Sequence, residues 1–267
     1  MQPGGLPKPG FAPVRSLGVG FGFLTRLDLA PRRPAANGEL ARAAWTFPVV
    51  GLVVGAAGGG ITAGALALEL PPLLAAIFGV AAMVLLTGAL HEDGLADVAD
   101  GFGGAFEREA KLRIMRDSRI GTYGVVALVL VLAARLAAIA AIQAPLATLL
   151  SVIAAAGLSR AAMVWLMAAL PPARDSGLGA AAGRPDARGV AAATIIALAL
   201  AVAALGPVGG AIASLAAAMV AGIFGTLALR QIGGATGDVL GGAQQLTEIA
   251  ALVAAAVVFD RLGGWSS

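Results

Sequence analysis

Four carboxylates gather in the stretch HEDGLADVADGFGG, which covers residues 91–104 and interrupts a chain that is otherwise rich in apolar residues. Glu92, Asp93, Asp97 and Asp100 place 4 of the chain's 15 acidic side chains within 9 residues. Acidic side chains next to apolar segments repel one another and resist losing water, so this arrangement calls for a compensating cation. A solvated acidic loop is the simpler alternative.

The spacing of the aspartates indicates which cation they suit. In a helix, Asp93 and Asp97 are four residues apart and Asp97 and Asp100 three apart, so the three side chains share one face. Oxygen ligands suit a hard cation such as Mg²⁺, whose sites leave room for water and substrate phosphates. We therefore expect Asp93, Asp97 and Asp100 to bind Mg²⁺, and we place Asp97 and Asp100 in the catalytic set.

Arginines follow the acidic motif in KLRIMRDSRIGTYG, residues 111–124. Helical spacing would bring Arg113 and Arg116, or Arg116 and Arg119, to one face. Arginine suits phosphate because its planar fork donates two parallel hydrogen bonds. Taken alone, these residues are better explained by anchoring on the cytoplasmic side. Beside a carboxylate cluster they favour phosphate binding, because a Mg²⁺-bound diphosphate needs both kinds of group.

A third polar cluster, GGATGDVLGG, covers residues 233–242. Its glycines allow a ligand to approach the backbone closely, and exposed N–H groups bind anions, so we expect Gly237 to contact phosphate. Asp238 is a candidate metal ligand or base. His91 is the only histidine, and the acids beside it would favour its protonated form. It could contact phosphate or assist proton transfer, and a structural hydrogen bond is the alternative.

Composition makes this an integral membrane protein. Of its 267 residues, 59% are hydrophobic and 12% are charged, against about 25% charged in soluble domains. The continuous apolar runs favour helices over a β-barrel. The abundant Ala and Gly predict tight helix packing, although codon usage in a GC-rich genome explains them equally well. The absence of Cys excludes disulfides, thiolate metal sites and thiol catalysis.

Seven apolar segments are long enough to cross a bilayer, which takes about 20 residues. Short turns at ELPP, QAP and GPVGG separate three of the pairs. Arg135 and Arg160 interrupt two segments, and such isolated charges face a bundle interior or a polar cavity. The expected spans are 43–68, 70–90, 120–143, 146–170, two within 189–229, and one from about 239 to 259.

The basic residues predict the orientation. With seven spans, 15 of the 18 Lys and Arg residues lie on one face, which places the N-terminus and all polar loops in the cytoplasm. Residues 1–20 are expected to form a disordered arm and 21–262 a single integral membrane catalytic domain. The segment SLGVGFGFLT, residues 16–25, is expected to lie at the membrane surface.

Taken together, HEDGLADVADGFGG, MRDSRIGTYG and TGDVLGGAQQLTEIA resemble the cobalamin synthase, or adenosylcobinamide-GDP ribazoletransferase, family. FLTRL at 23–27, WTFPVVGLVVG at 45–55 and SGLG at 176–179 also fit the pattern of that family. The resemblance covers roughly residues 21–255. Glu92 stands where the family usually has an apolar residue, which speaks against Glu92 as a metal ligand, and Asp28 replaces a usual proline.

The resemblance implies a reaction. Adenosylcobinamide-GDP and α-ribazole, or its 5′-phosphate, give adenosylcobalamin, or its 5′-phosphate, and GMP, with Mg²⁺ required. The expected partners are these substrates and the bilayer of the bacterial cytoplasmic membrane, with the active site on the cytoplasmic face. No nucleic acid partner is expected, and a homo-oligomer is left open. In the mechanism, the aspartates hold Mg²⁺, the three arginines neutralise phosphoryl charge, and Asp100 or Asp238 accepts the hydroxyl proton.

Two other functions stay open at this stage. A CDP-alcohol-type phosphotransferase also uses an aspartate motif with Mg²⁺, although the fuller DGxxAR pattern is missing here. A divalent-cation or small-solute transporter would carry its essential charges near the middle of the membrane. In this sequence the acids lie at one edge, and only Arg135 and Arg160 lie deeper.

Overall fold

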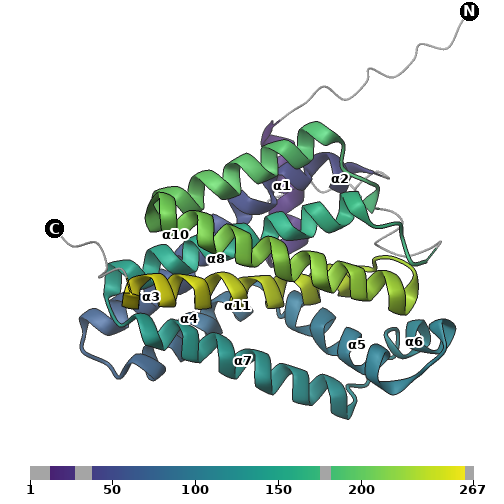
Figure 1. Cartoon of the computed structure of the whole chain (residues 1–267), viewed down its shortest axis with the longest axis horizontal. Coiled ribbons are helices and arrows are strands. Elements are labelled where there is room, and N and C mark those ends of the chain that lie inside the picture. Colours follow the sequence, from purple (N-terminus) through teal and green to yellow (C-terminus); the bar gives the residue numbers. More distant parts are fainter. Residues whose placement is uncertain (1–12, 28–37, 175–181, 262–267) are drawn as a thin grey trace, which may run out of the picture.

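The computed structural model describes residues 13–27, 38–174 and 182–261, and in these ranges the chain is helical (Figure 1). The described residues form no β-strand, and a single isolated bridge joins Pro172 to Ala235. The helices are α1 (Pro13–Leu24), α2 (Glu39–Ala43), the 3-10 turn η1 (Ala44–Thr46), α3 (Phe47–Ala67), α4 (Pro72–Thr87), α5 (Leu90–Gly104), α6 (Arg108–Ile114), α7 (Thr122–Ile142), α8 (Pro145–Ala169), α10 (Ala187–Ile232) and α11 (Gly237–Arg261).

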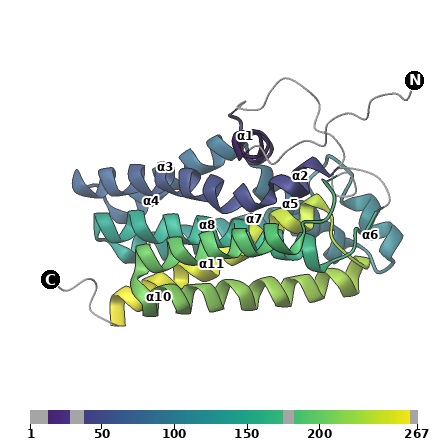
Figure 2. The same cartoon turned by 90° about the horizontal axis from the view of Figure 1, so that it is seen from above.

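The long helices form one bundle around α8, which packs against α3, α10 and α11 (Figure 2). Small residues set the closest contact. Gly51 and Gly55 of α3 face α8 so closely that a Cβ on Gly51 would lie 2.3 Å from the carbonyl oxygen of Ala156. Such small-residue interfaces are typical of membrane helices, so the predicted tight packing is confirmed.

Five helices are long and apolar enough to span a membrane, or six when the bent pair α4–α5 is counted as one span. Large apolar side chains such as Val129, Leu215 and Ile223 are 62%, 71% and 64% exposed on the outside of the bundle, where lipid would cover them. The predicted all-α, polytopic membrane bundle is therefore confirmed. The number of seven spans and the cytoplasmic N-terminus stay predictions.

The predicted break at GPVGG is present inside α10. Gly206 has φ of 72° and ψ of 171°, values outside the helical region, and Pro207 follows it. The two arms of α10 double back on each other at this point (Figures 1 and 2). Gly210 packs against the backbone of Ala201, which brings the arms together directly after the turn.

The expected span over 70–90 is not one continuous helix. Helix α4 ends at Thr87, and α5 begins at Leu90 after a bend of 88°. Gly88 and Ala89 both have positive φ, 67° and 59°, and this left-handed backbone cannot continue a helix. The acidic motif therefore lies on a helix of its own, which turns away from α4.

Residues 13–20, which the expected disordered arm included, are helical and belong to α1. Two contacts order this helix. Arg15 forms an ion pair with Glu39 of α2, and Gly20 lies directly against Thr46. Residues 1–12 and Asp28 lie outside the described residues. That α1 lies at the membrane surface stays a prediction.

Candidate active site

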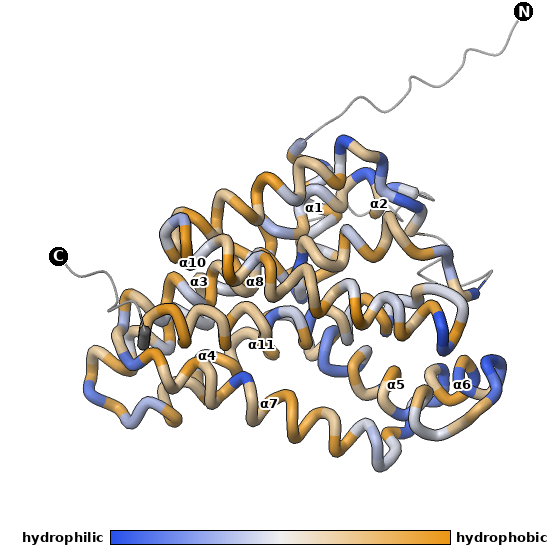
Figure 3. Tube along the Cα trace, in the orientation of Figure 1, coloured by the Kyte–Doolittle hydropathy of each residue, from blue (hydrophilic) through white to orange (hydrophobic). Residues whose placement is uncertain are grey.

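The polar segments gather at one end of the bundle, where α5, α6 and the connections α8–α10 and α10–α11 meet (Figure 1). The hydrophilic parts of α2 and α6 lie at this end as well (Figure 3). Arg108 ties the segments together, because its Nε donates to the carbonyl of Ile232 at 2.8 Å and its Nη2 to that of Ala173 at 2.9 Å. Lys111 adds a hydrogen bond to Gln231.

The first turn of α11 lies against the middle of α5. A Cβ on Gly94 would lie 2.9 Å from the carbonyl oxygen of Asp238, so only glycine fits at this crossing. The contact places Asp238 beside Asp93, which is exposed, and Asp97, which is half-buried. Two of the three predicted metal ligands thus meet a third carboxylate from the other end of the sequence.

The charges around Asp97 are mostly negative. The carboxylates that act on it are those of Asp238, Asp93 and Asp100, and the opposing positive charge comes from Arg174. Arg174 Nη1 lies 3.9 Å from Asp238 Oδ2. An excess of carboxylates over cations at a half-exposed position leaves the site in need of further positive charge.

Thr236 fixes the orientation of Asp238. Its hydroxyl donates to Asp238 Oδ2 at 3.2 Å and accepts from the backbone N–H of Val239 at 3.2 Å, which caps the start of α11. Gly237, the first residue of the helix, is exposed, and a Cβ added to it would meet no atom within 4 Å. This leaves the backbone at Gly237 open to a ligand, as its proposed role requires.

The Asp100 side chain points to the start of α7. Its Oδ2 accepts from the N–H of Gly121 at 2.7 Å and its Oδ1 from that of Gly124 at 2.9 Å, at the start of α7. No side chain of the neighbouring chain segment caps α7, so Asp100 supplies the missing acceptor and a negative charge at the positive end of the helix. Its predicted roles as a metal ligand and a base stay predictions, while its contacts are those of a positioning residue.

The three arginines predicted to bind phosphate have different surroundings in the structure. The positive charge of Arg116 acts on the Arg174 guanidinium, so these two side chains lie near each other. Arg113 is exposed on α6. Arg119 forms an ion pair with Asp117 at 2.7 Å, and this hydrogen-bonded partner lowers the pKa of Asp117 to about 2.

Arg174 is the residue that sequence reasoning missed at this site. Its Nη2 donates to the carbonyl of Leu112 at 3.0 Å, which aims the rest of the side chain toward Asp238. The signal for it was its place as the first basic residue after a long apolar span. The neighbouring SGLG motif lies outside the described residues.

His91 does not lie among the acids. It is 1% exposed, and the charges that act on it most are the guanidinium groups of Arg160 and Arg135. Neither imidazole nitrogen has a hydrogen-bond partner among the described residues. Positive neighbours and burial disfavour a protonated imidazole, so the expectation of a charged His91 is wrong.

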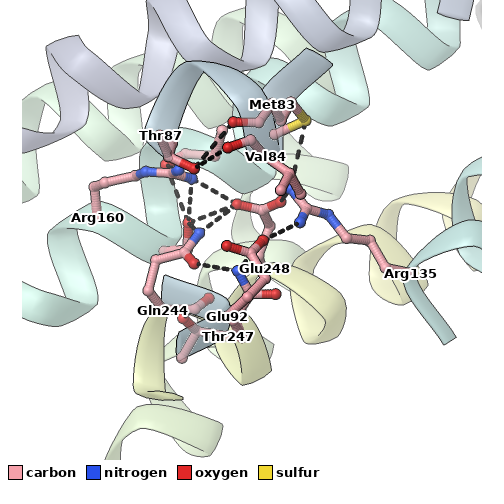
Figure 4. A network of polar contacts seen from close by, with 12 residues as sticks. Met83, Val84, Thr87, Glu92, Arg135, Arg160, Gln244, Thr247 and Glu248 are labelled. Atoms are coloured by element: carbon pink, nitrogen blue, oxygen red, sulfur yellow. Dashed lines mark hydrogen bonds and ion pairs between the residues drawn. The ribbon is translucent and has the colours of Figure 1, made fainter. Parts of the chain in front are cut away.

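A second polar cluster lies in the interior of the bundle. We call it the inner network, and it contains Glu92, Arg135, Arg160, Gln244, Gln245 and Glu248. Figure 4 shows the Glu248 carboxylate between the two guanidinium groups. Arg160 Nη1 lies 2.6 Å from Glu248 Oε2, and Arg135 pairs both with Glu248 and, at 3.4 Å, with Glu92.

The inner network has balanced charge. Two arginines face two glutamates, and Gln245 donates to Glu92 at 3.0 Å. The prediction that Arg135 and Arg160 face the bundle interior is confirmed. Glu92 is engaged here and not with the aspartates, which agrees with its exclusion as a metal ligand.

The carboxylates at this end of the bundle suit Mg²⁺ in kind. Among the described residues no three His, Asp or Glu side chains are already assembled around one point. Mg²⁺ commonly takes only one or two carboxylates and completes its shell with water and phosphate oxygens. Asp93, Asp97 and Asp238 offer such carboxylates with little positive charge nearby, so the residues fit the ion.

The fold and the site define a polytopic helical membrane protein with a carboxylate and arginine cluster at one end. The sequence model of the family described as cobalamin-5-phosphate synthase matches residues 16–256. The chain belongs to this family.

Curated relatives agree with this assignment. A protein of Bradyrhizobium diazoefficiens is 47% identical over 243 residues, which cover 91% of this chain and 94% of the relative. One from Allorhizobium ampelinum is 41% identical over 252 residues, which cover 91% and 97%. Both are named adenosylcobinamide-GDP ribazoletransferase. No solved structure matches the chain.

Proposed function

We propose that this protein joins adenosylcobinamide-GDP to α-ribazole, or to its 5′-phosphate, in a late step of cobalamin biosynthesis. The products are adenosylcobalamin, or its 5′-phosphate, and GMP. The names of the relatives support this reaction. The observation that carries it is the meeting of Asp93, Asp97 and Asp238 with Arg174, because a diphosphate needs carboxylates for a metal and a guanidinium for its own charge.

Asp93 and Asp97 would hold Mg²⁺. When bound, the ion supplies positive charge to the diphosphate oxygens and to the GMP leaving group. Asp100 keeps the start of α7 in place behind this cluster through its two backbone hydrogen bonds.

The protein groups have separate tasks in the transfer. Arg174 and Arg116 bind phosphoryl oxygens and offset the charge that grows on them. The ribazole hydroxyl attacks the cobinamide-side phosphorus, where a new P–O bond forms as the bond to the GMP oxygen breaks. Asp238, which accepts a hydrogen bond from the Thr236 hydroxyl, would accept the hydroxyl proton.

The location is part of the proposal. We place the protein in the bacterial cytoplasmic membrane, with the acidic cluster on the cytoplasmic face. The clustering of α5, α6 and the basic connections at one end of the bundle supports this orientation. A homo-oligomer stays open, and nothing in the site calls for nucleic acid.

The test is product formation by protein purified in detergent. With adenosylcobinamide-GDP and α-ribazole, adenosylcobalamin should appear when Mg²⁺ is present and disappear with a chelator. Glu69→Gln, an exposed acid at the opposite end of α3, is the control and should keep full activity. A folded wild type that forms no product under these conditions would sink the proposal, and CDP-alcohol substrates and ion flux in liposomes would be examined next.

A further inference from the structure

A cavity of about 260 Å³ lies beside the candidate active site. The end of α8 forms one wall through Met167 and Leu170, and Leu240 of α11 forms another. Its size is just below the range of about 300–1,000 Å³ that is typical of small-molecule pockets. It therefore suits one ring system and not a whole corrinoid or dinucleotide.

The cavity offers a ligand few polar partners. Prolines, alanines and the side chains above make up most of its lining. Arg184 and Thr236 are the polar side chains at its rim, and both are engaged. Arg184 donates to the carbonyls of Ala168 and Ala169, and Thr236 contacts Asp238 and the α11 backbone.

The walls of the cavity are held by backbone hydrogen bonds. The N–H of Ala173 donates to the carbonyl of Ala235 at 2.9 Å, and the N–H of Ala235 donates to that of Pro171 at 2.8 Å. Arg108 adds its hydrogen bond to Ala173 at 2.9 Å. These bonds join the α8–α10 and α10–α11 connections, so the shape is formed before a ligand arrives.

The cavity adjoins the acidic cluster at Thr236. This residue lines the cavity, and its hydroxyl lies 3.2 Å from Asp238 Oδ2. A flat group in the cavity would therefore bring its attached sugar toward Asp238 and Arg174. That is where an attacking hydroxyl is needed.

We propose that this cavity binds the fused aromatic base of the acceptor nucleoside, the dimethylbenzimidazole of α-ribazole. The assignment rests on the function proposed above. That base has an apolar, methyl-bearing edge, so this edge loses no hydrogen bonds to water when it enters an apolar cavity. Guanine, the base of the donor, carries several donors and acceptors on its edge, which would be buried here without partners at a cost.

The first test uses the unaltered protein. Free 5,6-dimethylbenzimidazole should inhibit the reaction competitively with α-ribazole and not with adenosylcobinamide-GDP. Free guanine should not compete with α-ribazole. Competition of dimethylbenzimidazole with the donor, or of guanine with the acceptor, would overturn the assignment.

A second test fills the cavity. Leu170→Trp should raise the KM for α-ribazole by about tenfold and leave the KM for adenosylcobinamide-GDP within about twofold. Leu215→Trp, on the lipid-exposed surface of α10, is the matched control and should leave both KM values unchanged. A rise in the KM of the donor alone, or no rise in either, would contradict the proposal.

The two proposals fail in different ways. Absence of product from the folded wild-type protein with both substrates would reject the proposed function. Normal product formation with an acceptor KM that neither the inhibitor nor Leu170→Trp changes would reject the cavity assignment alone.

Discussion

The protein contains two polar clusters that share the helices α5 and α11 but differ in how their charges are matched. In the inner network, Arg135, Arg160 and Glu248 are each at most 2% exposed, and two arginines balance two glutamates. The outer cluster consists of Asp93, Asp97 and Asp238, which are half-buried or exposed, and its nearby positive charge is Arg174, 3.9 Å from Asp238.

The difference separates a structural role from a binding role. Buried charges of opposite sign that pair within the protein join helices and leave little net charge for a ligand. The outer aspartates keep an excess of negative charge that the protein does not neutralise. The inner network therefore joins α5 to α7, α8 and α11, and the outer cluster is where we propose that a cation and phosphates bind.

The sharpest test of the comparison is Asp97→Asn. Turnover should fall by about 10³-fold, because an amide cannot replace the carboxylate in holding a cation. The melting temperature in detergent should stay the same or rise, because repulsion among the aspartates is relieved. A variant that kept near-normal Mg²⁺-dependent turnover would remove Asp97 from the metal site.

Glu248→Ala should act mainly on stability, whereas Asp97→Asn should act mainly on turnover. The change leaves two buried guanidinium groups without their shared partner, so the free energy of unfolding should fall by about 3 kcal/mol or more. Thermal unfolding in detergent measures this loss. The double variant Arg160→Met/Glu248→Met leaves a neutral Arg135–Glu92 pair and should be more stable than Glu248→Ala. Equal stability of the two would show that charge pairing is not what matters.

Arg174→Ala should lower kcat/KM for adenosylcobinamide-GDP by about 10²-fold, because the residue is the guanidinium nearest to the aspartates. Stability should change little, since the side chain is only half-buried. Steady-state kinetics against the donor give the result. An unchanged kcat/KM would indicate that the arginines of the α6–α7 region bind the phosphates and that Arg174 does not.

Asp100→Ala tests the contrast within the acidic motif itself. Removing the acceptor of two N–H groups at the start of α7 should lower the free energy of unfolding by about 1–2 kcal/mol. Asp117→Ala, an exposed acid of the nearby connection, is the control. Unchanged stability with a full loss of turnover would instead assign Asp100 to the metal.

Arg119→Ala should have the smallest effect, with kcat/KM within about threefold of wild type. The side chain is 87% exposed and pairs with Asp117. Because this pair lowers the pKa of Asp117 to about 2, both partners stay charged at every practical assay pH and the comparison is not distorted by titration. A large loss of activity would mean that the α6–α7 connection closes over the substrate.

The sequence was sufficient for features that follow from local chemistry. The helical acidic motif, the break at GPVGG and the interior position of Arg135 and Arg160 were all predictable, because they depend on spacing, on Gly–Pro chemistry and on the cost of a charge in lipid. The sequence could also have indicated that Glu248 pairs with Arg135 and Arg160, because two arginines inside apolar spans require acids nearby.

Other features depend on contacts between distant residues. Asp100 caps α7 only because the turn after α6 brings Gly121 to it, and Arg174 reaches Asp238 only because two connections are bonded side by side. The sequence did not indicate the bend after Thr87, because glycine and alanine are common in membrane helices. The positive φ values of Gly88 and Ala89 follow from the surrounding packing. No periodicity in the sequence encodes such contacts.

The bend between α4 and α5 also bears on how the protein is made. Helix α4 has 16 residues, too few to cross a bilayer alone, and α5 carries four acids, too many to enter lipid alone. Glu92 of α5 finds its partners Arg135 and Gln245 only on α7 and α11, which the ribosome produces later. The acidic helix α5 is therefore held in place by helices that are translated after it.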